Sequence, residues 1–90
     1  MLVSLFPIGQ LVATRNAVGS VPQGEILKAL ARHTKGDWGD LDPEDKQLND
    51  MAVLQGSRLL SSYKTESGVK FWIITECDRS YTTVLLPEDY

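Results

Sequence analysis

The sequence predicts an α+β fold, in which an N-terminal segment or short strand and two helices precede a three-stranded antiparallel β-meander. Apolar residues first recur at helical spacing, and after Gly56 they alternate as in strands. Turn residues then divide the alternating part into three runs. With 90 residues the chain is expected to form one small domain, residues 1–90.

The first helix is predicted over residues 21–35. Ser20 and Gln23 fit a capping box, in which each side chain bonds to a free backbone N–H of the first turn. Gly36 is a typical residue to end a helix. The apolar stripe of this helix consists of Ile26, Leu27, Leu30 and Ala31.

The second helix is predicted over residues 43–55. Asp42 before Pro43 supplies an N-cap acceptor and a backbone angle that suits the first helical turn, and Gly56 ends the helix. We expect the two helices to pack as an antiparallel pair. The inner face of the second helix is expected to contain Leu48, Met51 and Ala52.

Three strands are predicted over residues 58–64, 69–76 and 81–86. Residues 65–68 and 77–80 form the turns between them, so neighbouring strands are antiparallel.

The middle strand is apolar on both faces, with Phe71 and Ile73 on one and Trp72 and Ile74 on the other. Two short helices cover only one face of such a sheet, so the second face needs its own cover. One solution is a two-fold homodimer. The other is that the N-terminal residues 2–13, LVSLFPIGQLVA, fold back as a fourth strand or a lid.

Composition excludes several classes of function. The net charge is −3 and the nine Lys and Arg residues are scattered, so we expect no binding to nucleic acid. No apolar run is long enough to span a bilayer, and the single cysteine suits a reducing compartment, so a cytoplasmic location is expected. No Cys or His spacing fits a metal site, and no cofactor motif is present.

The candidate functional surface begins at the end of the first helix. His33 is the only histidine, and it is followed by an acidic segment that contains Asp37, Trp38 and Asp40. Half of the acidic residues lie between Asp37 and Asp50, where they either solvate the start of the second helix or form an acidic docking surface. We expect Trp38 to be partly exposed there, as an interface anchor.

Glu76, Asp78 and Arg79 complete the candidate surface at the second turn of the meander. A charge-assisted hydrogen bond between Asp78 and Arg79 is expected to fix this turn.

Four segments resemble a family of short, uncharacterised bacterial proteins that occur on plasmids and other mobile elements. They are HTKGDWGDL, EDKQLND, GSRLLSSY and WIITECDRSYTTVLLPEDY. The resemblance covers roughly residues 5–90 and implies a mobile-gene setting, but no established activity. Some members are labelled as restriction-enzyme subunits, although ninety residues cannot hold a methyltransferase domain.

These observations favour a binding function over an enzymatic one. The leading expectation is a protein-binding module of mobile-element origin that modulates a host defence or regulatory protein. The first alternative is a small toxin that acts on RNA or a host enzyme, because helices before a three-stranded meander resemble the RelE/ParE topology. The second alternative is a small enzyme that uses His33 with an aspartate, Asp37 or Asp78.

Overall fold

The computed structural model describes residues 4–90. The elements are, in chain order, β1 (Gln10–Ala13), α1 (Arg15–Ser20), α2 (Gln23–Thr34), α3 (Pro43–Gln55), β2 (Leu59–Lys64), β3 (Lys70–Thr75), β4 (Tyr81–Leu85) and the 3-10 helix η1 (Pro87–Asp89).

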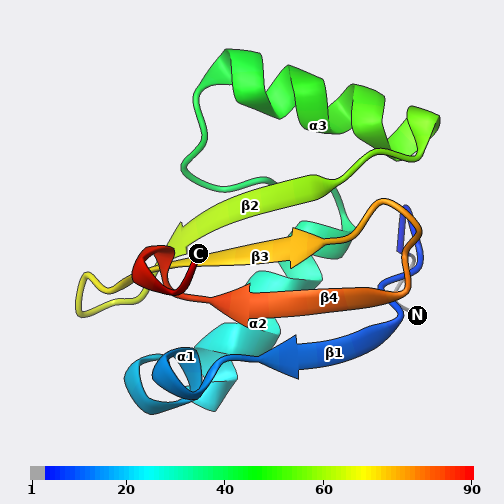
Figure 1. Ribbon diagram of the computed structural model, residues 1–90. Coiled ribbons are helices and arrows are strands. Elements are labelled where there is room, and N and C mark those ends of the chain that lie inside the picture. Colours follow the sequence, from blue (N-terminus) through cyan, green and yellow to red (C-terminus); the bar gives the residue numbers. More distant parts are fainter. Residues whose placement is uncertain (1–3) are drawn as a thin grey trace.

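The predicted α+β class is confirmed, but the sheet has four strands in the order β1-β4-β3-β2 (Figure 1). The antiparallel meander of β2, β3 and β4 is present as expected. The additional strand β1 pairs in parallel with β4, so the sheet is mixed. The expectation that the N-terminal segment adds a fourth strand is therefore confirmed for residues 10–13, whereas residues 1–3 lie outside the described part.

The bounds of α3 agree with the prediction because both of its ends carry strong local signals. The Asp42 carboxylate accepts a hydrogen bond from the Asp45 N–H at 2.8 Å, and Gly56 ends the helix with a φ of 74°. The first long helix is shorter than predicted. Ser20 belongs to α1, and α2 begins after Pro22 without a side-chain cap.

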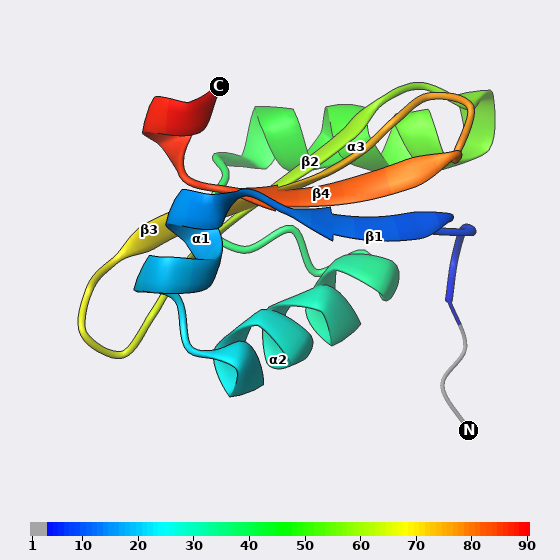
Figure 2. The ribbon, with the colours of Figure 1, turned by 60° about the horizontal axis from the view of Figure 1, so that its bottom comes forward.

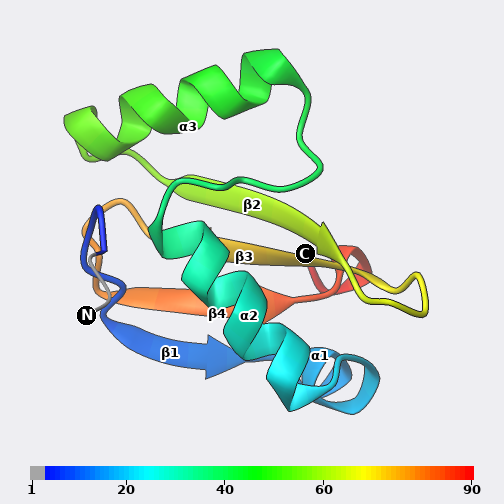
Figure 3. The same ribbon diagram turned by 180° about the vertical axis from the view of Figure 1, so that it is seen from behind.

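The two long helices do not pack as an antiparallel pair. Figures 2 and 3 show α2 on one face of the sheet, while α3 runs along the outer side of β2. A short linker was expected to bring them together, but each helix finds its own part of the sheet to cover.

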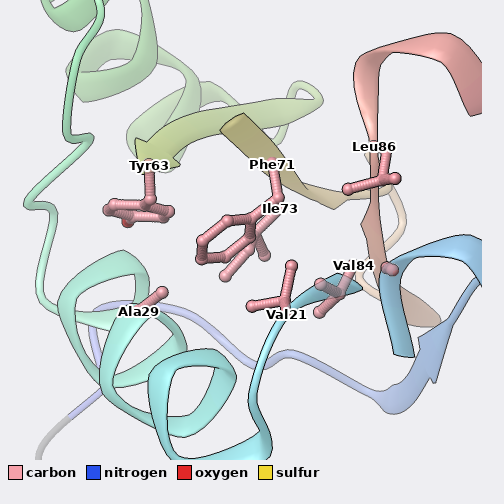
Figure 4. Packing of buried hydrophobic residues seen from close by; sticks show 8 residues of the cluster. Val21, Ala29, Tyr63, Phe71, Ile73, Val84 and Leu86 are labelled. Carbon is pink, nitrogen blue, oxygen red and sulfur yellow. The ribbon is translucent and has the colours of Figure 1, made fainter. Parts of the chain in front are cut away.

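The main hydrophobic core lies between the sheet and α2 (Figure 4). Tyr63, Phe71, Ile73 and Val84 extend from three neighbouring strands toward this helix. A second cluster lies nearer to α3 and consists of Phe6, Trp38, Ala52 and Leu59.

The opposite face of the sheet is largely covered by the chain itself. Ile74 is buried there, and the Trp72 ring contacts the Tyr90 ring edge-on, with 5.8 Å between centroids. Arg58 donates a hydrogen bond to the Tyr90 hydroxyl at 2.7 Å. The segment after β4 therefore supplies much of the cover that was expected from a dimer or from an N-terminal lid.

Candidate functional site

The sequence-predicted site is built around a chain of buried hydrogen bonds that begins at His33. The histidine is completely buried, and α2 presents its ring to β2 and β3. Its Nδ1 atom bonds to the Ser61 hydroxyl, and its Nε2 atom lies 2.9 Å from the Thr75 hydroxyl. The chain continues from Thr75 to Thr82 at 2.8 Å and ends at the Ile8 carbonyl, also at 2.8 Å.

The carbonyl at the end of this chain assigns the direction of each hydrogen bond as far as Nε2 of His33. Thr82 must donate its only hydroxyl proton to the Ile8 carbonyl, so Thr75 donates to Thr82. No proton of Thr75 is then left for the imidazole, and Nε2 of His33 must be the donor. In the uncharged ring, Nδ1 then has no proton and accepts that of the Ser61 hydroxyl. The neutral form of His33 is therefore the tautomer that is protonated at Nε2.

Aromatic rings enclose the same imidazole. Phe6 and Trp38 each meet it edge-on, with ring centroids 5.3 and 5.6 Å away. Burial, together with a smaller contribution from the charge of Arg79, lowers the pKa of His33 from its ordinary value of 6.5 to about 4. The ring is therefore uncharged at neutral pH.

This arrangement is better suited to holding the fold together than to catalysis. A serine hydroxyl that donates to an imidazole nitrogen is the starting geometry for a nucleophile and its base. Ser61 and His33, however, are both fully buried, and neither lines either of the two surface grooves described below. His33 also bonds to hydroxyls, where the enzyme hypothesis required an aspartate.

The expectation of an exposed Trp38 is wrong. Its side chain is 2% exposed, and its indole N–H donates to Asp50 at 2.9 Å. The apolar part of the ring packs between Phe6 and α3. Only the indole N–H edge faces the surface carboxylate of Asp50. His33 and Trp38 thus belong to the interior.

The Asp37 and Asp40 side chains remain on the surface, as predicted. Asp37 forms an ion pair with Arg32 at 2.7 Å, and this hydrogen bond holds the pKa of the carboxyl below its usual value. Arg32 also lies over the Tyr63 ring, whose hydroxyl donates to the Asp37 carbonyl at 2.7 Å. These contacts fix the path of the loop that begins at Asp37.

The second turn of the meander differs from its prediction because Asp78 and Arg79 do not pair. Asp78 accepts hydrogen bonds from Ser80. Arg79 adopts a φ of 61° and reaches the end of α3, where it donates to the carbonyls of Ala52 at 3.1 Å and Ser57 at 2.6 Å. A guanidinium at a helix C-terminus complements the helix dipole. Glu76 pairs weakly with Arg58 at 3.8 Å.

The structure thus divides the predicted site residues into three groups. His33 and Trp38 lie together in the interior, whereas Asp37 and Asp40 belong to the loop beside β2. Glu76, Asp78 and Arg79 lie at the far end of the strands. No group of three or more potential metal ligands occurs among residues 4–90.

Sequence reasoning missed an exposed apolar stripe on α3. The side chains of Leu48, Met51 and Leu54 are 59%, 47% and 88% exposed. They recur every three residues and so lie along the outward side of the helix. Of the predicted inner face, Ala52 is buried as expected, and its buried neighbour is Asn49 rather than Leu48 or Met51. The apolar spacing of Leu48 and Met51 is visible in the sequence, but it predicts an inner face of the helix, whereas the structure places both residues on the outside.

Two shallow grooves flank these elements. One has a volume of about 450 Å³ and lies between residues 4–8 and α2, with Phe6, Ile8, Leu27 and Leu30 among its lining residues. The other, of about 280 Å³, lies beside the exposed stripe and is lined by Leu41, Asp45, Leu48, Asn49 and Leu60.

No protein-family model, curated protein sequence or solved structure matches the chain. The resemblance to mobile-element proteins therefore stays an expectation from the sequence. None of the described helices has the length and apolarity that crossing a bilayer would require.

Proposed function

We propose that the protein is a protein-binding module whose docking surface is the outward side of α3. The observation that carries this proposal is the exposed stripe of Leu48, Met51 and Leu54. Single exposed apolar residues are common on protein surfaces, but a contiguous row on one helix is typical of an interaction site. Helices that bind in grooves use anchors at this spacing.

The stripe is not needed for the fold of the chain. Asn49 and Ala52 attach α3 to the sheet, and Asp42 and Gly56 define its ends. Polar residues at the outward positions would therefore leave these contacts intact. The groove next to Leu48 extends the apolar surface toward Leu41 and Leu60.

Charge indicates the chemistry of the partner. Glu44, Asp45 and Asp50 are exposed on α3, and Lys46 is its only basic residue. An apolar stripe with an acidic surround fits a protein groove with an apolar floor and a basic rim, because opposite potentials accelerate and orient association. The acidic docking surface, one of the two interpretations of these carboxylates in the sequence, is thus part of the proposal, with leucine and methionine in place of Trp38 as anchors.

The identity of the partner as a host defence or regulatory protein rests on the resemblance to mobile-element proteins. The toxin-like alternative gains no support from the site, because it needs an accessible His or Tyr in a basic groove. His33 is buried, and the surface near it contains the carboxylates of Asp37 and Asp40.

Site-specific photo-crosslinking in a bacterial host tests the proposal. A photoreactive amino acid replaces Met51 in one variant and Lys28, an exposed residue of α2, in the control. We expect a defined protein adduct from position 51 only. Adducts of the same protein from both positions, or none from position 51, would contradict docking through α3.

Once the partner is identified and purified, its affinity for variants of the chain tests the proposal quantitatively. The double substitution Leu48→Ser with Leu54→Ser should weaken its affinity by at least about tenfold, which corresponds to about 1.4 kcal/mol. Leu27→Ser is the matched control, because Leu27 is 55% exposed on a different helix. Equal losses for both variants would assign the effect to the fold.

A further inference from the structure

The two edges of the sheet differ in how their backbone groups are satisfied. At the β2 edge the Asn49 side chain bonds to both the N–H and the C=O of Leu60. Two residues further along, the Trp38 carbonyl and the Asp40 N–H pair with the backbone of Ser62. This edge is therefore closed by the chain itself, as natural sheets commonly arrange.

The β1 edge is open within the described residues. The N–H groups of Gln10 and Thr14 bond to β4, so those of Leu11 and Ala13 point away from the sheet. No backbone group of residues 4–90 pairs with the outer side of β1, and all four of its residues are exposed.

The open edge also lacks the charges that usually prevent strands from associating. Residues 10–14 have the sequence QLVAT, which is uncharged in a chain of net charge −3. Val12 is 42% exposed, and Tyr81, which pairs with Gln10 and lies diagonally from Val12 on the same face, is 43% exposed. These two side chains form an apolar margin along the edge, on the face opposite α2.

We propose that a second copy of this chain occupies the β1 edge, in an antiparallel pair of β1 strands about a two-fold axis at Val12. Residues close to a two-fold axis lie near their own copies, so like charges there would repel. An uncharged strand avoids this cost. The occupant is therefore better matched to a second copy than to a strand of unrelated, charged sequence.

The register follows from the outward-pointing groups. With the axis at Val12, Leu11 of each protomer is opposite Ala13 of the other, and their free N–H and C=O groups pair. The two Val12 side chains then meet directly, and the Val12–Tyr81 margins join across the axis. Arg15 after β1 comes toward the start of the partner's β1, near the turn in which the Asp78 carboxylate accepts hydrogen bonds from Ser80.

This interface is independent of the proposed docking surface, because β1 and α3 lie at opposite edges of the sheet (Figure 1). Light scattering across the micromolar range tests it. We expect the wild-type chain to have twice the single-chain mass of 10.0 kDa. Val12→Lys and Val12→Glu should each give the single-chain mass, and an equimolar mixture of the two should restore the dimer.

Two further variants make the test decisive. Leu54→Lys places the same charge on α3 and should leave the dimer intact. Ala13→Pro removes an outward N–H without adding charge and should also give single chains. This variant keeps the interface testable if Val12→Lys fails to fold. A wild-type mass of one chain, or a dimer lost with Leu54→Lys but kept with Val12→Lys, would overturn the β1 interface.

Discussion

At the scale of single residues, His33 shows how a side chain that suggests chemistry can serve the fold. A lone histidine near a helix end gives no sequence signal of its burial. Its position became defined only when β2 and β3 brought Ser61 and Thr75 to its two nitrogens. Every polar atom of the ring is satisfied, so its burial costs little while it stays neutral.

The neutral state of His33 predicts a loss of stability in acid. Its pKa is about 4 in the folded chain and about 6.5 when the chain is unfolded, so between these values the unfolded state binds more protons. The contribution to stability is complete above pH 6.5 and is lost as the pH falls toward 4. We expect the free energy of unfolding, measured with urea, to decrease by roughly 3 kcal/mol across this window.

His33→Gln is the control for this effect, since an amide can replace hydrogen bonds but does not titrate in this range. The variant should be less stable at pH 7, yet nearly constant in stability from pH 6.5 to 4.5. The surface carboxyls with lowered pKa values, such as Asp37 and Asp78, titrate at lower pH. An unchanged slope in the variant would show that another group senses the acid.

At the scale of elements, local signals predicted where helices and strands lie better than they predicted how these pack. The bounds of α3 were predicted correctly, and those of the three meander strands to within one residue, because caps, glycines and alternation are encoded nearby in the sequence. The parallel pairing of β1 with β4 joins Gln10 to Tyr81, which no local pattern reveals. For the same reason, no local pattern showed which side of α3 faces the sheet.

The buried side of α3 contains a polar residue, Asn49, where the usual pattern of a core-facing helix has an apolar one. Asn49→Leu gives this side the apolar residue that a core helix usually presents, but it leaves the N–H and C=O of Leu60 without their partner. We expect a loss of about 1–3 kcal/mol in the free energy of unfolding, from urea denaturation. Association through the exposed β2 edge should accompany it.

Gln47→Leu makes almost the same chemical change at an exposed position of α3. Its effect on stability should stay within about 0.5 kcal/mol. If both variants lost the same stability, the amide of Asn49 would contribute nothing specific to the β2 edge.

At the scale of the whole molecule, the interior consists of two hydrophobic clusters with different neighbours. One lies between the sheet and α2 and includes Phe71. The other includes Phe6 and Trp38, whose rings enclose His33. The N-terminal segment therefore does more than add a strand, because Phe6 and the Ile8 carbonyl complete the surroundings of the imidazole chain.

This division predicts that equal damage to the two clusters has unequal effects on His33. Phe6→Ala should admit water to the imidazole, which reduces the cost of charging it and raises its pKa from about 4 toward 6.5. Phe71→Ala should leave that pKa nearly unchanged, although each variant loses about 3–5 kcal/mol of stability. NMR titration of the imidazole C–H signals at low temperature measures the difference. Equal rises in both variants would mean that His33 is shielded by the whole interior, whereas a rise in Phe6→Ala alone assigns the shielding to the N-terminal segment.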